Sequence, residues 1–380
     1  MKSFKGAWTA LAVTILVGGL TIFTPQKYAA SSESKSEAPS REKVERYVRE
    51  RFGLVSTTKV TIASFEPSAD PGFLQTMVTV NDGKQSKDVP VSVSKDGRYL
   101  LVGPWVPLDG DVDAAIVQQV REHFKIPAKV NLATGALGPS PYHDFLVTTL
   151  TATDGSQTQT QKFIVTGDKK FLGLGDLYPF NVDPRRQALG IMSLKDQPTQ
   201  GPASAPVTIV EYADLECPSC AHMHQYLEDE FLPKYGNKVR MVFKEFPLPF
   251  HAWSKNAAVA NECAFQMDPA KFVPYRTLIF KHQTDIDASQ ASSTDVRDLL
   301  LGYGQQAGLD RGRLSACFDA QASLARVEAG RKEGEQLSVT QTPTFYVNGR
   351  IYPGPTPEIL TQAVEDALNA AKEPPTRASR

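Results

Sequence analysis

The stretch VTIVEYADLECPSC, residues 207–220, decides how the fold is interpreted. Its first six residues, VTIVEY, are mostly apolar or β-branched, which is typical of a central buried strand. The next four residues lead directly to Cys217, and a helical pattern runs from Ala221 to Glu230. The sequence therefore predicts that Cys217 and Cys220 lie where a strand passes into a helix.

Such a position changes the chemistry of the first cysteine. Unpaired backbone N–H groups and the positive end of the helix dipole favour a thiolate over a thiol. A lowered pKa would make Cys217 nucleophilic near neutral pH, and Cys220, one turn deeper, would resolve the mixed disulfide. Pro218 suits the first helical turn, because its missing N–H would be unpaired there in any case.

Two histidines follow the dithiol, so a metal site is an alternative. Zinc or copper could in principle be held by Cys217, Cys220, His222 and His224. However, His222 points away from the helical face of the others, and a closed site rarely takes four ligands from one short helical run. A purely structural disulfide is another alternative, although so short a loop gains little from closure. We expect a redox dithiol, exposed histidines and no metal.

The rest of residues 204–372 has the order of one α/β domain. A second strand is predicted at VRMVFKEF (239–246), followed by a mostly helical stretch at about 254–337. TFYVNGRIY (344–352) predicts a hairpin with an Asn-Gly turn, and PEILTQAVEDALNAA (357–371) predicts a closing helix. Residues 373–380 are a tail.

An internal duplication precedes this domain. Residues 44–108 laid over residues 116–180, at a constant offset of 72, are identical at 18 of 65 positions, where chance would give about four. Each copy begins with a helical pattern and continues with three strand signals, which in the first copy are FLQTMVTV, DVPVSVS and RYLLVG. We therefore predict two tandem α+β repeats, at 41–110 and 111–183, with a role in binding, spacing or oligomerisation.

The amino terminus has the features of an export signal. Lys2 and Lys5 precede an uncharged apolar run at residues 6–23. We expect residues 1–30 to be a cleaved signal peptide or, by preference, a retained signal anchor, and both place the body of the protein outside the cytoplasm. Residues 31–40 read as a polar tether, and residues 184–203 as a linker.

Composition excludes some functions. The formal net charge is −1, and neither a concentrated basic surface nor a phosphate-binding glycine loop is found, so nucleic acid is not an expected partner. Four cysteines in an exported chain favour disulfides over a reduced metal cluster.

Two motifs together indicate a family. GPASAPVTIVEYADLECPSC (201–220) with QTPTFYVNGR (341–350) resembles the DsbA-type branch of the thioredoxin-like superfamily, over roughly residues 200–371. The resemblance implies a thioredoxin-like domain with a helical insertion. It also implies dithiol-disulfide exchange, by oxidation or isomerisation, in unfolded exported proteins, with no cofactor and with a redox partner that we expect to be membrane-bound. A periplasmic copper chaperone or client-binding protein with the same dithiol is the alternative function.

The same resemblance implies roles for further residues. Pro343 would be cis and lie against the dithiol, the backbone of Thr342 would pair with the client, and Glu211 would assist proton transfer to the deeper cysteine. An exposed strand glutamate is the alternative for Glu211. Pro218-Ser219 departs from the Pro-His of the strongest oxidants, so this dipeptide should tune the couple to be less oxidising.

Other residues are assigned with the family in mind. Similar helical insertions in some DsbA-like proteins carry a second disulfide, and this resemblance implies a Cys263–Cys317 bond; two buried free thiols are the alternative. Phe246 and Phe250 are expected to be mostly core, with some aromatic residues lining a client groove. His251 is expected to cap the next helix, with a position near the dithiol as the alternative.

The repeats show a shorter resemblance. VSVSKDGRYLLVGPWVPL (91–108) is similar to the end of the cystatin-like dimerisation domain of DsbC and DsbG disulfide isomerases. The chain would then carry two such domains, which could pair with each other or support a homodimer. The sequence leaves both arrangements open.

Overall fold

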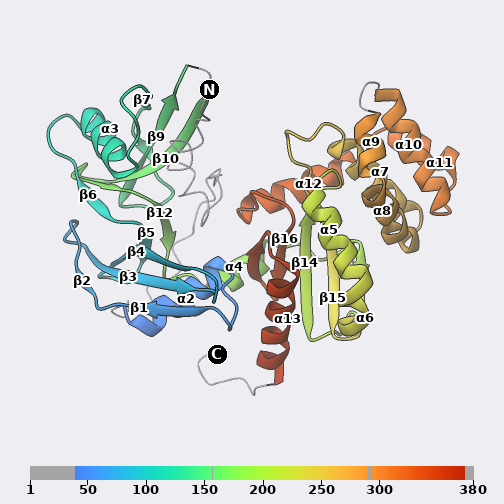
Figure 1. Ribbon diagram of the computed structural model, residues 1–380, viewed down its shortest axis with the longest axis horizontal. Helices are drawn as coiled ribbons and strands as arrows, with labels where there is room; N and C mark the ends of the chain where they lie inside the picture. Colours follow the sequence, from blue (N-terminus) through green and yellow to red (C-terminus); the bar gives the residue numbers. More distant parts are fainter. Residues whose placement is uncertain (1–38, 156, 290–292, 373–380) are drawn as a thin grey trace. The chain divides into compact units, whose positions relative to one another are not determined.

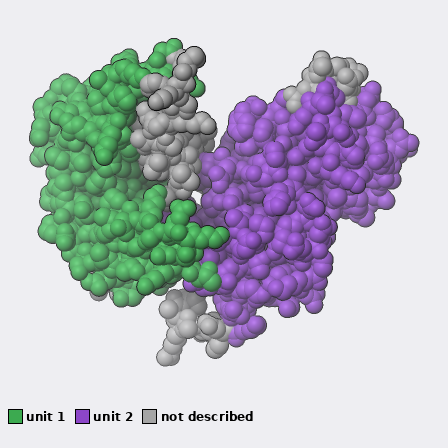
Figure 2. Space-filling model, viewed as in Figure 1, with its two compact units in different colours: residues 1–49, 57–183 green, residues 50–56, 184–380 purple. Residues whose placement is uncertain are grey.

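The computed structural model describes residues 39–155, 157–289 and 293–372. It divides into two compact units (Figure 2): unit 1 comprises Met1–Arg49 and Thr57–Asp183, and unit 2 comprises Glu50–Ser56 and Pro184–Arg380. The predicted export signal, most of the tether and the tail lie outside the described residues. Within the described part of the chain, no helix combines the length and the apolar character that a membrane crossing requires.

Unit 1 is built from two antiparallel sheets, each accompanied by a helix (Figure 1). The first sheet has the order β1-β3-β4-β5-β12, with β2 on β3, and its strands are β1 (Lys59–Ile62), β2 (Glu66–Pro67), β3 (Phe73–Asn81), β4 (Ser86–Ser94), β5 (Tyr99–Val102) and β12 (Asp176–Pro179). The second has the order β6-β11-β10-β9-β7, with β8 on β9, and its strands are β6 (Trp105–Pro107), β7 (Asn131–Thr134), β8 (Gly138–Pro139), β9 (Phe145–Thr153), β10 (Thr158–Thr166) and β11 (Phe171–Gly173). The helices are α2 (Arg41–Phe52), whose last turn belongs to unit 2, and α3 (Val112–His123).

The two halves of unit 1 exchange their last strands. β6 leaves the first half to pair with β11, and β12 leaves the second half to pair with β5. The predicted boundary between residues 110 and 111 therefore does not separate two self-contained sheets. Gly103 and Gly175, 72 residues apart, precede the exchanged strands. A Cβ on Gly175 would lie 1.9 Å from the Val102 carbonyl oxygen, and one on Gly103 would lie 2.5 Å from that of Leu174, so glycine permits the two crossing segments to approach this closely.

The exchange also produces a shared aromatic core. Trp105, on the exchanged strand β6, is almost fully buried and stacks on Phe145 with 5.8 Å between ring centroids. Its ring also lies 5.0 Å from that of Phe73, the residue 72 positions before Phe145. Aromatic contacts of this kind add to the stabilisation from area burial. The two halves thus pair within one chain.

Unit 2 is centred on a five-stranded sheet with the order β13-β15-β14-β16-β17. Its strands are β13 (Thr199–Gln200), β14 (Val207–Ala213), β15 (Val239–Glu245), β16 (Thr344–Val347) and β17 (Arg350–Pro353). Strands β14 and β15 are parallel and the other pairs are antiparallel. The segment predicted as a linker instead contains β13 and α4 (Pro184–Ile191). It is structured because Ala188 and Met192 pack against Val210 and Tyr212 on one face of the sheet.

Helices cover both faces of this sheet. Residues of α5 (Pro218–Tyr226), the π-helical turn η2 (Leu227–Phe231), α6 (Leu232–Tyr235) and α13 (Pro357–Lys372) share a core with the face that carries Ile209. The opposite face packs on α4 and on the residues that follow α12. The helical stretch predicted at about 254–337 consists of α7 (Ser254–Met267), η3 (Pro269–Lys271), α8 (Phe272–Lys281), α9 (Gln283–Ala288), α10 (Ser293–Gln306), α11 (Arg311–Asp319) and α12 (Leu324–Gln336).

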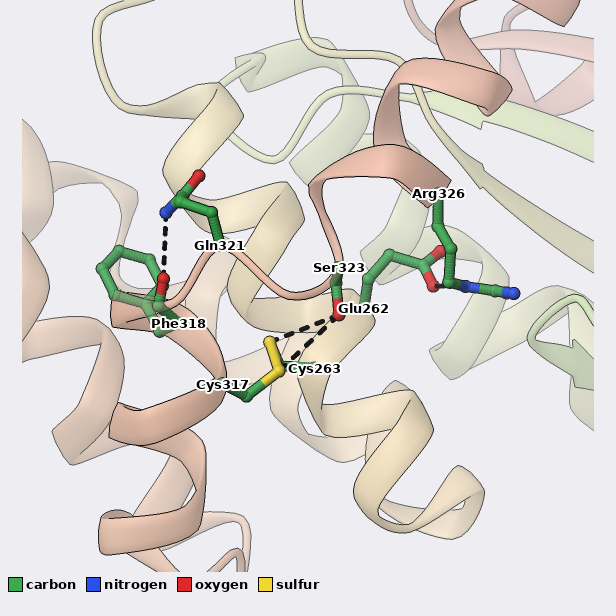
Figure 3. The surroundings of a disulfide bond; sticks show 7 residues. All are labelled: Glu262, Cys263, Cys317, Phe318, Gln321, Ser323 and Arg326. Atoms are coloured by element: carbon green, nitrogen blue, oxygen red, sulfur yellow. Dashed lines mark hydrogen bonds and ion pairs between the residues drawn. A yellow bond between two sulfur atoms is a disulfide. The ribbon is translucent and has the colours of Figure 1, made fainter.

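A disulfide ties this helical region together. Cys263 of α7 and Cys317 of α11 are bonded, as the resemblance implied, with an S–S distance of 2.01 Å. The Ser323 hydroxyl lies 3.3 Å from the Cys263 sulfur and 3.7 Å from the Cys317 sulfur (Figure 3). The bond closes a loop with a sequence separation of 54, so it links distant parts of the insertion.

Candidate active site

The dithiol lies at the predicted strand-to-helix junction. Cys217 is the N-cap residue of α5, with extended backbone angles, and Pro218 occupies the first turn. Cys220 is fully buried, whereas Cys217 retains 8% exposure, and neither is in a disulfide. Pro218 and Ser219 are both exposed. The first sulfur is therefore the more accessible of the two.

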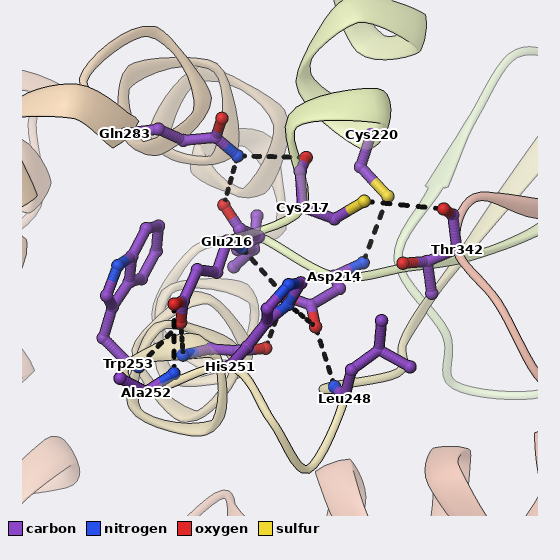
Figure 4. A network of polar contacts seen from close by, with 12 residues as sticks. Asp214, Glu216, Cys217, Cys220, Leu248, His251, Ala252, Trp253, Gln283 and Thr342 are labelled. Atoms are coloured by element: carbon purple, nitrogen blue, oxygen red, sulfur yellow. Dashed lines mark hydrogen bonds and ion pairs between the residues drawn. The ribbon is translucent and has the colours of Figure 1, made fainter. Parts of the chain in front are cut away.

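The predicted client-binding peptide lies beside this sulfur. The Thr342-Pro343 bond is cis, and the Cys217 thiol donates a hydrogen bond to the Thr342 carbonyl oxygen over 3.5 Å (Figure 4). The Cys220 sulfur accepts a hydrogen bond from the Asp214 backbone N–H, also over 3.5 Å. Residues more than 120 positions apart in the sequence thus form one site.

The two thiols have very different acidities. The pKa of Cys217 is lowered to about 5, first by its hydrogen bond with the Cys220 thiol, then by Thr342 and by the backbone N–H groups of Cys220 and Ser219, while burial opposes the shift. The donor on the Thr342 side chain is its hydroxyl, which is buried and has no hydrogen-bond partner in the described structure. Burial raises the pKa of Cys220 well above its usual range. At neutral pH Cys217 is a thiolate and Cys220 a thiol.

Asp214 organises the loops around the dithiol, and sequence reasoning missed it. Its buried carboxylate accepts hydrogen bonds from the Glu216 N–H (2.8 Å), the Leu248 N–H (2.7 Å) and the Ser254 hydroxyl (2.5 Å). The His251 Nδ1 lies 2.8 Å from it (Figure 4). An acidic residue three positions before Cys217, at the end of a strand, was the available signal, because such residues often bind loop N–H groups.

The prediction that His251 caps the next helix is wrong. The Glu216 carboxylate accepts hydrogen bonds from the N–H groups of Ala252, Trp253 and Ser254 at the start of α7. His251 turns toward Asp214 instead. Gln283 of α9, also unforeseen, donates to the carbonyls of Leu215 (2.8 Å) and Cys217 (3.1 Å) and so holds the same loop.

Glu211 is fully buried, so the interpretation as an exposed strand residue is wrong. It forms an ion pair of 3.0 Å with Arg276 of α8, which also lies 3.4 Å from Glu245 of β15. Burial raises the pKa of Glu211, and Arg276 opposes the shift. Sequence reasoning missed Arg276 and Glu245. A lone arginine in the mostly apolar run FVPYRTLIFK was the signal, because a charge there requires a buried partner.

The histidines after the dithiol are not arranged as ligands with it. His222 is exposed. The prediction that His224 is exposed is wrong, because its side chain is buried and its Nε2 lies 2.8 Å from the Thr277 hydroxyl. Burial lowers the pKa of His224 to about 3, so it is uncharged at neutral pH. Among the described residues, no group of three or more histidine, cysteine or acidic side chains is arranged to hold a metal ion.

The two phenylalanines of the loop before α7 differ. Phe246 is buried, as predicted, and packs against Tyr212. Phe250 is 75% exposed, so its assignment to the core is wrong. Its ring contacts that of His251, with 4.7 Å between centroids. Phe250 extends from the loop that Asp214 anchors beside the dithiol, which gives this side of the site an exposed aromatic surface.

Comparison with known proteins shows which families unit 2 resembles. The family model Thioredoxin_4, described as thioredoxin, matches residues 193–366. This part of the chain therefore resembles the thioredoxin family. Disulfide bond formation protein D of Bacillus subtilis is 27% identical over 163 residues, which are 43% of this chain and 72% of that protein. The resemblance of this domain to DsbA-type proteins is thereby confirmed.

Longer relatives contain a similar segment. The Na(+)/H(+) antiporter NhaA 3 of Salinispora tropica is 33% identical over 175 residues, which are 46% of this chain and 25% of the antiporter. The chain thus spans about a quarter of the length of such relatives. Among solved structures, oxidised BdbD of Bacillus subtilis has a TM-score of 0.42 and 24% identity over 47% of this chain and 95% of its own. Wolbachia pipientis alpha-DsbA1 has a TM-score of 0.42 and 19% identity over 48% and 96%.

Proposed function

We propose that this chain is a thiol-disulfide oxidoreductase that exchanges disulfides with exported proteins through Cys217 and Cys220. One observation carries the proposal: a cysteine whose pKa is lowered to about 5 lies at a helix N-terminus and contacts the backbone before a cis proline. The low pKa supplies a thiolate, and the Thr342 backbone lies beside it, where it can align the extended segment of a client that reaches Cys217.

Oxidation of a client requires two exchanges. A client thiolate attacks the Cys217 sulfur of the oxidised enzyme, a bond forms between these two sulfurs, and Cys220 leaves with the electron pair of the broken disulfide and takes up a proton. A second client thiolate then attacks the client sulfur of the mixed disulfide, and Cys217 leaves as a thiolate. The client has lost two electrons and gained a disulfide, and the enzyme dithiol has gained them.

The acidity of Cys217 favours this direction or isomerisation over reduction. A thiol of low pKa is a good leaving group, and ionisation stabilises the reduced enzyme, so its disulfide is the more readily transferred. An exchangeable mixed disulfide at Cys217 also permits isomerisation, in which the enzyme starts and ends reduced. We infer that a separate redox partner, at the membrane, returns the dithiol to the state that each turnover needs.

Location outside the cytoplasm is part of the proposal. The sequence pattern of residues 1–30 supports export, and the Cys263–Cys317 bond is of the kind that persists in oxidising compartments. Retention of the first segment as an inner-membrane anchor is testable by fractionation of cells that express the full chain. Recovery in the soluble periplasmic fraction would refute the anchor.

We further propose that unit 1 is a duplicated cystatin-like module that holds clients. Equivalent strands at the 72-residue offset build both of its sheets, and a cavity of about 500 Å³ is lined by Phe73 and Tyr99 from the first half and by Phe145 and Phe171 from the second. Charged side chains, among them Asp96, Arg98 and Asp168, line the same cavity, so it can contact both the apolar and the polar groups of an unfolded client. Because the two halves of unit 1 pair with each other, one chain forms the pairing of cystatin-like units that two subunits would otherwise form. A monomer is therefore the expected state.

A mixed-disulfide trap tests the function. With Cys220→Ala, the full chain should accumulate exported proteins bound through Cys217, released by reductant and absent when Cys217 is also replaced. A metal carrier would accumulate none. Failure of the trap with folded protein would overturn the proposal, and a measured reduction potential with a scrambled-disulfide assay would separate oxidase from isomerase.

A further inference from the structure

Strand β10 of unit 1 is an inner strand of its sheet at one end and an edge strand at the other. It pairs with β9 along its whole length, from Thr158 to Thr166, but β11 reaches only Ile164 and Val165. Within the described part of unit 1, residues 158–163 are therefore bridged on one side only. In an antiparallel strand, alternate residues direct their N–H and C=O groups away from the partner strand. β10 thus offers backbone groups with which another extended chain can pair.

The accessible part of this edge is residues 158–161, here called the open edge. Its residues alternate between exposed and half-buried, and in the described structure their backbone groups pair with β9 alone. At its inner end, the Gln161 Nε2 donates to the Lys162 carbonyl over 3.4 Å, so an acceptor beyond the open edge is already in use. Because the backbone directions alternate, about two N–H and two C=O groups of the open edge point outward.

The open edge lacks the residues that usually protect an edge strand. Natural proteins place charged side chains or proline on such strands, because unprotected edges pair with other chains. The open edge reads Thr-Gln-Thr-Gln and contains neither a charge nor a proline, and the first charged residue, Lys162, follows it. An edge without this protection is either an aggregation hazard or a surface that the protein uses.

The first half of unit 1 supplies a matched case. At the 72-residue offset the equivalent segment is residues 86–90 of β4. In the described structure this segment pairs with β3 alone, because β5 reaches only Val91, Ser92 and Val93. It reads Ser-Lys-Asp-Val-Pro, so two charges and a proline protect it. The two halves share one backbone arrangement, and only the first half has the protecting residues.

One side-chain contact is common to both hairpins. The Thr79 hydroxyl of β3 donates to Asp88 of β4 over 2.6 Å, and the hydroxyls of Thr151 and Thr160, at the equivalent positions, lie 3.1 Å apart. An aspartate at position 160 could therefore accept from Thr151 as Asp88 accepts from Thr79. The charges of the first half can thus be transferred to the second half without loss of the contact between the strands.

The small size of the open edge indicates what pairs with it. A stable interface between two copies of a protein involves about 20–30 residues on each side, far more than residues 158–161 supply. An extended segment of an unfolded protein needs only the main-chain groups of the edge, and a short pairing can be released again. The size of the open edge therefore favours a client segment over a second copy of the chain.

We propose that the open edge of β10 binds an extended segment of an unfolded client by strand addition. The inference rests on the proposed function, in which unit 1 holds clients, and it specifies how: the client segment becomes a further strand of the second sheet. The segments that fit are rich in β-branched or aromatic residues and free of proline, because proline has no N–H for the ladder. Binding through main-chain groups depends little on the remaining sequence of the client.

Hydrogen exchange of the full chain tests strand addition. The probe is a reduced, unfolded protein whose cysteines are blocked by carboxymethylation, so it cannot exchange disulfides. Its addition should slow the fast-exchanging amides of residues 158–161 at least about fivefold, since a hydrogen-bonded N–H exchanges only when the bond opens. Residues 86–90 should not change. Unchanged exchange at residues 158–161 at the highest soluble probe concentration, or equal slowing in both segments, would overturn the proposal.

A variant with the charges of the first half is the matched test. Gln159→Lys with Thr160→Asp gives the open edge the charges of β4 and should weaken probe binding at least about fivefold. The reverse exchange, Lys87→Gln with Asp88→Thr, leaves the open edge intact and should not weaken binding. Circular dichroism checks folding, and Thr158→Lys carries the same prediction if the double variant does not fold. Wild-type affinity in the folded charged variant would overturn the proposal.

The outcomes separate this inference from the proposed function. The probe has no free thiol, so its binding does not depend on Cys217. If wild type oxidises client thiols but the probe leaves the open edge unchanged, strand addition is wrong and the oxidoreductase function stands. If the open edge binds the probe but Cys217 exchanges no disulfides, the oxidoreductase function fails and the binding site stands. Slowing at residues 158–161 that grows with the concentration of the full chain alone would indicate a second copy at the edge and would overturn the proposal.

Discussion

Replacement of Cys220 by alanine should make Cys217 less acidic. The hydrogen bond from Cys220 is the largest of the contributions that lower the pKa of Cys217 to about 5, from an ordinary value of 9.0. At pH 7 a thiol of pKa 5 is about 99% ionised and one of pKa 9 about 1% ionised, a difference of roughly 100-fold. Alanine removes this donor but leaves Thr342 and the helix N–H groups, so the pKa should rise by at least about one unit.

The assay is a pH titration of the thiolate by its ultraviolet absorbance, checked by the rate of alkylation. A titration is required because a rise from about 5 to 6 changes the ionised fraction at pH 7 only from about 99% to about 90%. Cys220→Ser is the matched control: its hydroxyl can still donate to the thiolate, so its midpoint should lie between those of wild type and the alanine variant.

Two results would refute this reasoning. A wild-type midpoint above about 7 would mean that the helix start and its donors do not create a thiolate at Cys217. Equal midpoints for the alanine and serine variants would mean that a donor at position 220 contributes nothing. In either case the acidity of Cys217 would need another cause.

The remaining predictions concern stability and its pH dependence. Because the pKa of Cys217 is depressed, ionisation stabilises the reduced fold above the ordinary cysteine pKa, and this contribution is lost as pH falls through about 5. Denaturation of both redox forms should therefore show the reduced form losing stability relative to the oxidised form from pH 7 to pH 4. A constant difference between their free energies of unfolding would contradict this prediction. The double variant Cys263→Ala/Cys317→Ala should lower the free energy of unfolding in a urea titration by about 4 kcal/mol, while the rate of Cys217 alkylation stays unchanged. A loss below about 1 kcal/mol would contradict this prediction. Arg276→Met should cost about 3–5 kcal/mol, because it leaves two carboxyl groups without their buried cation, and a neutral effect in the same titration would argue against the ion pairs. Gly175→Ala should destabilise unit 1 by about 3 kcal/mol or more, since the new Cβ meets the Val102 carbonyl. Gly138→Ala is the control and should change little, because a Cβ there has nothing within 4 Å. Equal changes in the melting temperature of the two variants, measured by calorimetry, would argue against the strand crossing.

Local patterns predicted much of unit 2. The apolar run before Cys217 and the helical pattern after it were sufficient to place the dithiol, because strand and helix periodicities are local signals. The Asn-Gly pair likewise predicted the turn at Asn348-Gly349, and in the structure both residues adopt the positive φ that such a turn requires. The contact between Cys217 and Thr342 required the family resemblance, because no local signal joins positions so far apart.

What could not be predicted depends on tertiary partners. β6 is only three residues long, and its sequence gives no indication that it pairs with β11 instead of remaining beside β5. The buried ion pairs of Arg276 exist only because α8 packs over the sheet. The sequence therefore indicated that this arginine requires a buried acidic partner, but not which residue supplies it. His251 could not be assigned for the same reason: Asp214 competes for it, and Glu216 already binds the start of α7.

The central claim is that Cys217 exchanges bonds with sulfurs of other proteins. The most direct test mixes the oxidised full chain with a reduced, unfolded protein and follows the loss of client thiols. Transfer should persist in the Cys263→Ala/Cys317→Ala variant and disappear in Cys217→Ser. Transfer that survives Cys217→Ser, or that is lost with the distant disulfide alone, would contradict the account.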